Sequence, residues 1–177
     1  MRNGFRLGVF LLSFCVSASA FALDWEKKER EVSDFSAIRS QYINDIEVIG
    51  GGAKNKVILS GNPHLFNYVK TTVDNGILNI KAPRGVHVLI QAANLNSLEI
   101  VGEGHLEGKG LDVLGPLSIA LAGSVEVTLF GPVDLARVVT SGKTSLSAHW
   151  VDAQDMHIYT SEKSHVTLNG RAAQSHL

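Results

Sequence analysis

Three aligned stretches decide the fold: LSIALAGSVEVTLF at 117–130, ARVVTSGKTSLSAHW at 136–150 and MHIYTSEKSHVTLNG at 156–170. Their corner residues, together with an earlier glycine, recur at separations of 21, 19 and 20 residues: Gly102, Gly123, Gly142 and Glu162. Apolar residues stand four places before each corner (Leu98, Ile119, Val138, Ile158) and four places after it (Leu106, Val127, Leu146, Val166). A repeat of this length, with two short strands and a small-residue corner, is typical of a solenoid.

The repeat predicts an all-β fold built from coils of about 20 residues, as in a parallel β-helix-like solenoid. One coil cannot bury its own apolar face, so stacking creates the core, and the apolar rows should point inward. The corners bend sharply at the same place in each coil, which suits glycine because it adopts positive φ without a steric penalty. After the N-terminal segment, no capped pattern of period 3.6 indicates a helix.

The residues before the repeats read as strands and hairpins. Ile46 and Val48 alternate with acidic residues, Gly50-Gly51-Gly52 ends that run, and Val57 and Leu59 resume it, which is a strand–turn–strand pattern. Asn75-Gly76 is the preferred pair for a two-residue type I′ turn. Folding about that turn opposes Val73 to Leu78, Thr71 to Ile80 and Val69 to Ala82.

The order of these features resembles a known family. Arg30-x-Val32-x-x-Phe35-x-x-Ile38 precedes Ile46-x-Val48, Val57-x-Leu59-x-Gly61, the segment 73–80 and then the cornered repeats. Over roughly residues 30 to 170 this order resembles the putative auto-transporter adhesin, head GIN domain family. The resemblance implies a right-handed β-helix of the bacterial cell envelope and an adhesin-like role, and it defines no catalytic or binding residues. The chain departs from the pattern where Glu162 replaces the corner glycine.

The N-terminus reads as an export signal. Arg2 and Arg6 precede the apolar stretch 8–16, and small residues follow, with Ala20 or Ala22 as the cleavage position. Cys15, the single cysteine, lies within this signal, and a lipid anchor there is the rival interpretation. The expected organisation is a signal peptide at 1–22, an N-terminal arm at 23–34, the β-domain at 35–170 and a C-terminal tail at 171–177.

Composition narrows the function. The net charge is −1, with 16 Lys and Arg against 17 Asp and Glu, which argues against a nucleic-acid partner. Aromatic residues make up 7% of the chain, and most precede residue 70, which counts against a sugar-stacking groove on the repeats. No later segment is long and apolar enough to span a bilayer.

Two glycine motifs resemble nucleotide-binding loops. Gly142-Lys143-Thr144 has the end of a phosphate-binding loop, but Arg137 stands where that motif needs a glycine. Gly102-Glu103-Gly104 with Gly108 has the wrong spacing for a dinucleotide fingerprint, and no helix follows. Both are expected to be corner sequence, so no cofactor is expected.

Metal and acid–base sites are also not expected. His149, His157 and His165 are spaced by eight but occupy different places in the repeat, so they need not converge on a metal. Glu99, Glu103 and Glu107 would point outward on one strand face as a solvated acidic row, and Asp112 with Asp134 is the other carboxylate pair weighed. A glycosidase needs two carboxylates at a defined separation in a cleft.

These observations favour a non-catalytic exported protein that lies in the periplasm, on the outer surface or outside the cell. It would act as an adhesin-like module for a protein or glycan ligand. The alternatives are a carbohydrate-active enzyme on a β-helix and a purely structural periplasmic protein. The edge at His165–Asn169 is expected to pair with something, a second copy being one candidate, unless residues 170–177 fold back over it.

Overall fold

The computed structural model describes residues 25–41, 45–111 and 115–176. Within these ranges the chain is all-β, with twelve strands and one short 3₁₀ helix. The elements are β1 (Glu26–Glu31), β2 (Ala37–Gln41), β3 (Asp45–Gly50), β4 (Lys56–Gly61), η1 (Pro63–Tyr68), β5 (Lys70–Asp74), β6 (Ile77–Lys81), β7 (Val86–Ala92), β8 (Ser97–Lys109), β9 (Leu117–Val133), β10 (Leu135–Gly142), β11 (Ser145–Thr160) and β12 (His165–His176).

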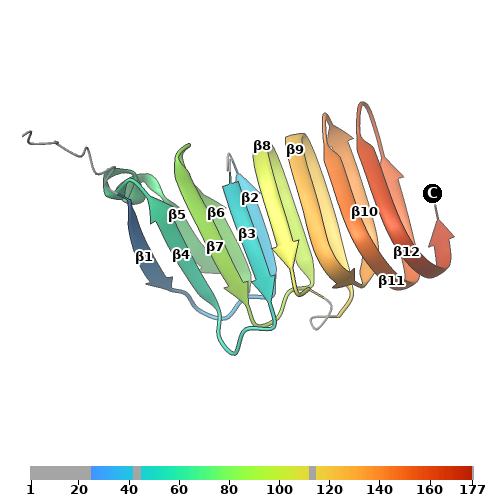
Figure 1. Ribbon diagram of the computed structural model, residues 1–177, viewed down its shortest axis with the longest axis horizontal. Coiled ribbons are helices and arrows are strands. Elements are labelled where there is room, and N and C mark those ends of the chain that lie inside the picture. The colour runs from blue at the N-terminus through green and yellow to red at the C-terminus, as the bar shows by residue number, and fades with distance from the viewer. Residues whose placement is uncertain (1–24, 42–44, 112–114, 177) are drawn as a thin grey trace, which may run out of the picture.

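The strands form one open sheet that bends into two flanks. β8 shows how the bend arises: its first part, Ser97–Val101, pairs with β2, and its second part, His105–Lys109, pairs with β3. On the β3 side the order runs β1-β4-β7-β3-β8, and on the β2 side β5 and β6 precede β2. Beyond β8 the strands pair in parallel through β9, β10, β11 and β12, side by side along the long axis (Figure 1).

The corner residues align as predicted. Gly102 pairs with Gly123, and Gly123 pairs with Gly142, in one parallel register. All three have positive φ, as does Glu162 with a φ of 61°. Glutamate adopts this region at a cost that glycine avoids. A positive φ therefore recurs at the corner whether or not the sequence supplies glycine.

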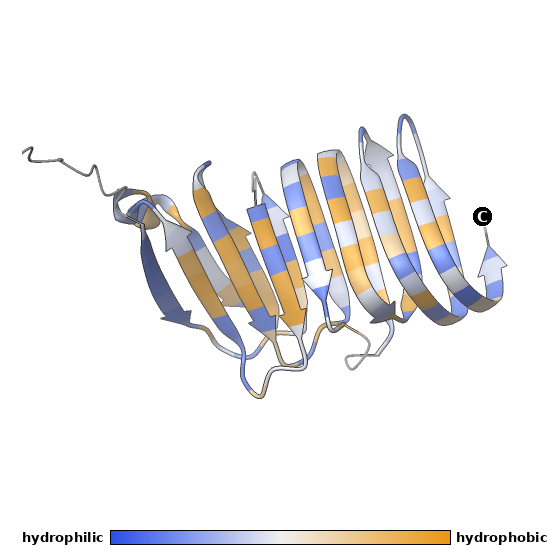
Figure 2. Cartoon of the chain, in the orientation of Figure 1, coloured by the Kyte–Doolittle hydropathy of each residue, from blue (hydrophilic) through white to orange (hydrophobic). Residues whose placement is uncertain are grey.

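The apolar rows point inward. Ile119, Val127, Val138 and Leu146 are buried, which confirms the predicted direction of these side chains. Ile158 is only half-buried where it packs against this core. Apolar and polar residues alternate along the strands in Figure 2, because successive strand residues point to opposite faces.

The hairpin prediction is confirmed at one place and wrong at another. β5 and β6 pair antiparallel about Asn75-Gly76, with Val73 opposite Leu78 and Thr71 opposite Ile80. β3 and β4 do not pair with each other, because β7 lies between them, parallel to β3 and antiparallel to β4. The glycine run 50–52 ends a strand, but it does not determine which strand pairs with that one.

The stretch 23–34, expected as an arm, contains an edge strand. β1 pairs antiparallel with β4 along its whole length and is mostly exposed. The Arg30 guanidinium donates to the carbonyl oxygens of Val69 and Phe66, at 2.9 and 2.8 Å, and to the Thr71 hydroxyl at 2.9 Å. A charged strand, which Figure 2 shows as hydrophilic, thus covers this end of the sheet.

The C-terminal residues also form a strand. Gly170 pairs with Val151 and His176 with His157, so the residues expected as a tail extend β12 rather than folding back over it. β12 is the last strand of the sheet order. The described residues contain no helix with the length and apolar character needed to cross a membrane. The predicted signal and its cleavage residues, Ala20 and Ala22, lie outside the described ranges.

Candidate functional site: an aromatic platform on the stacked strands

A break in strand alternation exposes two consecutive aromatic rings. In β11, Leu146 and Ala148 are buried, so strict alternation would bury Trp150 as well. The register shifts between Ala148 and Val151, and His149 and Trp150 both lie exposed before Val151 returns to the core. Such an irregularity re-aims side chains, and irregularities of this kind are common beside functional sites.

Phe130 of β9 extends this surface. Its ring stacks on His149 with the centroids 5.9 Å apart and an interplanar angle of 20°. Phe130 is 41% exposed and Trp150 is 67% exposed. We call Phe130, His149 and Trp150 the aromatic platform.

A shallow hollow of about 450 Å³ borders the platform. Pro132 and Trp150 lie at one side of it, and Asp152, Asn169 and Arg171 supply polar groups. The Arg171 guanidinium lies 3.3 Å from the Asp152 carboxylate across neighbouring strands. A hollow that combines an exposed aromatic ring with a few polar groups has the general composition of a small-ligand site.

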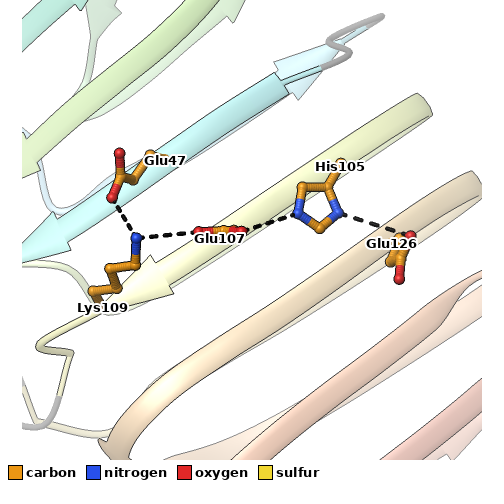
Figure 3. Close-up of polar contacts among 5 residues, drawn as sticks. All are labelled: Glu47, His105, Glu107, Lys109 and Glu126. Carbon is orange, nitrogen blue, oxygen red and sulfur yellow. Dashed lines mark hydrogen bonds and ion pairs between the residues drawn. The ribbon is translucent and has the colours of Figure 1, made fainter.

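A row of charged groups continues from the platform across β9, β8 and β3 (Figure 3). The Lys109 ammonium lies 5.9 Å from the Phe130 ring centroid, and it contacts Glu47 at 2.7 Å and Glu107 at 3.1 Å. His105 links Glu107 to Glu126 at longer distances, 3.6 and 3.8 Å. The row places alternating charges on an outward sheet face.

Hydrogen bonding within the row shifts two pKa values in opposite directions. The pKa of Glu107 is lowered, chiefly by the hydrogen bond that Lys109 donates to it. The pKa of Lys109 is raised, chiefly by its hydrogen bond to Glu47 and next by that to Glu107. Both shifts favour the charged forms, so Glu107 and Lys109 form a lasting ion pair at neutral pH.

A larger hollow, of about 840 Å³, lies at the glycine corners. Tyr68, Pro83, Gly102 and Gly123 line it, with the Arg84–Glu103 ion pair at 3.1 Å.

The model of one family, described as putative auto-transporter adhesin, head GIN domain, matches residues 34–176. The chain belongs to this family. The match confirms the resemblance seen in the order of the sequence features. A comparison with curated proteins finds no match in sequence.

Solved structures similar to this head GIN domain include two described as putative adhesins. The one from Parabacteroides distasonis is 12% identical with a TM-score of 0.56, over 85% of this chain and 76% of that one. The one from Bacteroides fragilis is 10% identical with a TM-score of 0.49, over 85% and 95%. A third, described as a putative lipid binding protein from Parabacteroides distasonis, is 16% identical with a TM-score of 0.43, over 85% and 92%. The first likeness shows a shared fold, and the TM-scores of the other two support no inference.

The carboxylates of β8 do not form the single row predicted for them. Because the strand bends at Gly102, Glu99 lies on the β2 flank, where it accepts a hydrogen bond from Arg39 at 2.8 Å. Glu103 lies at the corner beside Arg84, and Glu107 lies on the β3 flank beside Lys109. Asp134 follows β9, and Asp112 lies outside the described residues.

Gly142-Lys143-Thr144 and Gly102-Glu103-Gly104 lie at corners, as expected, whereas Gly108 lies on the β3 flank of β8. Gly142-Lys143-Thr144 joins β10 to β11, and the Thr144 hydroxyl, which is buried, donates to Ser164 at 3.1 Å. Gly102-Glu103-Gly104 and Gly108 lie inside β8, and a strand rather than a helix follows.

The three histidines weighed for metal binding take separate partners. His149 stacks on Phe130, His165 accepts or donates in a 3.2 Å contact with Thr167, and His157 lies beside His176 and Asp155. Sequence reasoning missed the last group because it considered the spacing of eight. On strands the informative signals are the spacing of two in Asp155-x-His157 and the repeat offset from His157 to His176.

Proposed function

We propose that this protein is a non-catalytic, exported glycan-binding module of the bacterial envelope, and that the aromatic platform receives the ligand. The observation that carries the proposal is the exposure of His149 and Trp150 together at the irregularity in β11, beside the hollow at Asp152 and Arg171. A flat aromatic ring offers apolar area with little loss of side-chain freedom, and the polar groups beside it can accept and donate hydrogen bonds to hydroxyls.

The backbone at this site indicates that the fold holds the exposed side chains of His149 and Trp150 in place. Gly170 of β12 has a φ of 151° and lies against Val151, where a Cβ atom would overlap the Val151 backbone. β12 therefore places a residue without a side chain, Gly170, opposite the part of β11 that follows Trp150. Functional surfaces are most precise when rigid elements hold them in this way.

Adhesion is supported by the family to which the chain belongs, which is named for adhesins. The N-terminal sequence, with Arg2 and Arg6 before an apolar run and small residues, supports export. The parallel register at intervals near 20 residues supports a right-handed β-helix-like solenoid for β8 to β12, whose side wall suits extended ligands.

The alternative of a carbohydrate-active enzyme has less support. Glu99, Glu103 and Glu107, the carboxylates considered for it, each lie beside a cation and on different sides of the bend. A glycosidase instead uses a pair of carboxylates that face each other across a cleft. A protein ligand, or no ligand, is distinguished from a glycan by the experiment below.

The proposal is tested on an array of acidic and neutral oligosaccharides probed with the purified protein. We expect binding to a defined subset, and we expect Trp150→Ala to weaken it by about tenfold or more, as for loss of a stacking aromatic anchor. Tyr159→Ala is the matched control, because Tyr159 is 54% exposed but lies on the other flank, beside Arg137. Binding that survives Trp150→Ala, or no binding to any oligosaccharide, contradicts the proposal.

A further inference from the structure

The last two strands bring three potential metal ligands together. Asp155 and His157 lie two residues apart on β11, and therefore on the same side of that strand. His176 of β12 pairs directly with His157. Two histidines and one carboxylate thus meet on one face of the sheet, with their ligand atoms all within 4.8 Å of one another.

Neither histidine is held to the carboxylate by a good hydrogen bond, and both nitrogens lie near the separation that a shared metal ion requires. Nε2 of His157 lies 3.5 Å from Oδ2 of Asp155, and Nε2 of His176 lies 3.5 Å from Oδ1 of the same carboxylate. A good N–H···O hydrogen bond is shorter, about 2.7–3.2 Å. Ligand atoms around a tetrahedral zinc ion, each about 2.0–2.1 Å from the metal, lie about 3.3–3.4 Å from one another.

The two imidazole rings lie face to face and do not yet converge on one point. They are stacked, with centroids 4.7 Å apart and an interplanar angle of 12°. A metal ion lies in the plane of each imidazole that binds it, so one ring must rotate about its Cβ–Cγ bond when an ion enters. Both side chains are partly exposed, at 41% and 57%, which leaves room for that rotation.

We propose that Asp155, His157 and His176 bind one divalent transition-metal ion, Zn²⁺ being the natural candidate, with water completing the coordination. Imidazole nitrogen with a single carboxylate suits zinc, copper or nickel, whereas magnesium and calcium prefer all-oxygen sites. This departs from the sequence-based expectation of no metal. The site is separate from the aromatic platform, so it holds whether or not the platform binds glycans.

The position of the site gives the ion a structural role. His176 is at the end of β12, the last strand of the sheet order. An ion held by His176 and by two residues of β11 ties the end of β12 to β11. Because the ion binds the folded arrangement and not the unfolded one, it raises the stability of the last strand pair.

The test is calorimetric titration of the purified protein, without a histidine tag, with ZnCl₂ and separately with MgCl₂. We expect one Zn²⁺ per chain, an increase in the unfolding temperature, and no Mg²⁺ binding. His176→Ala and Asp155→Asn should each weaken Zn²⁺ binding by about tenfold or more. His149→Ala and His165→Ala, which remove histidines outside the site, should not change it.

A second readout uses Co²⁺ in place of Zn²⁺, because its visible absorption reports imidazole coordination and does not depend on stability. We expect absorption bands that His176→Ala abolishes. No Zn²⁺ binding below millimolar concentration overturns the proposal. Binding that is weakened equally by His149→Ala and His176→Ala also overturns it, because that pattern indicates scattered surface histidines.

Discussion

Gly123 lies directly against the carbonyl oxygen of Gly102, so closely that a Cβ atom at Gly123 would overlap it. The two residues are neighbours in the parallel register of β8 and β9, and Gly142 stands in the same relation to Gly123. Glycine is therefore required at these corners for two reasons: the neighbouring strand lies too close for a Cβ atom, and φ is positive.

Substituting Gly123 by alanine should lower the free energy of unfolding by about 3 kcal/mol, since it combines strained backbone with steric overlap. Gly131→Ala is the control, because Gly131 also has positive φ, 83°, but its Cβ would meet nothing within 4 Å. The control should cost only about 1–2 kcal/mol, the strain of the left-handed conformation alone. Denaturant unfolding measures both, and equal losses would show that the overlap is relieved at no cost.

Substitutions of inward-facing residues should lower the free energy of unfolding by amounts that depend on how deeply each side chain is buried. Val138 is fully buried, so Val138→Asp places an unpaired charge in the core and should cost about 3 kcal/mol or more. Ile158 is half-buried, so Ile158→Asp should cost about half as much. Val139→Asp, at the outward neighbour of Val138, should cost under about 1 kcal/mol. Thermal unfolding that ranks these three in another order would contradict the assigned register.

Local sequence patterns predicted the register of the later strands well and the partners of the early strands poorly. The period near 20 and the Asn75-Gly76 turn are local signals, and both match the observed pairing. The position of β7 between β3 and β4 depends on pairing between residues far apart in the sequence, and no local pattern indicates it. The strand 26–31 consists entirely of charged residues, and it looked like an arm because an edge strand buries few side chains.

The platform was missed for a related physical reason. Alternation from Leu146 and Ala148 places Trp150 in the core, and only the register shift reverses that direction. Such a shift depends on the neighbouring strands, where Gly131 and Gly170 adopt positive φ. The proposed metal ligands were missed because His176 meets Asp155 and His157 only through the pairing of β12 with β11.

The effect of Lys109 on the pKa of Glu107 should be measurable by titration. Lys109→Met removes the main cause of the lowered pKa of Glu107, so that pKa should rise toward the ordinary value of a glutamate side chain. In the parent protein the lowered pKa stabilises the fold above the unfolded-state pKa, and this contribution is lost as pH falls through the folded-state pKa. Carbon-13 NMR of the Glu107 carboxyl reads the change directly. Lys143→Met, at a corner two strands away, should leave it unchanged.

The two ends of the sheet differ in a way that predicts self-association. The charged strand β1 covers one end, whereas at the other end β12 pairs only with β11 among the described residues, and Val166 and Leu168 remain half-buried. We propose that this edge pairs with β12 of a second copy, since an edge strand is a template for pairing and a twofold axis lets identical edges meet.

Light scattering across concentration should show dimers, and Thr167→Lys should abolish them by placing a charge on the edge strand. Thr128→Lys is the control, because Thr128 stands in the same row but inside the sheet. Thr167→Pro would be a less specific test of edge pairing, because it would also remove a hydrogen bond to β11. The His165 amide donates to Thr144, so by alternation the Thr167 amide faces β11 as well. A monomer at every concentration would rule out edge pairing.

The glycan-binding account is tested most directly by the fluorescence of Trp150. The chain has two tryptophans, Trp25 and Trp150, so Trp25→Phe leaves the platform tryptophan as the only one. Titrating this variant with the oligosaccharides that bind on the array should shift and saturate its emission, with the same Kd as binding measured by calorimetry. Saturable calorimetric binding without any change in Trp150 emission would contradict the account, because the ligand would then occupy another surface.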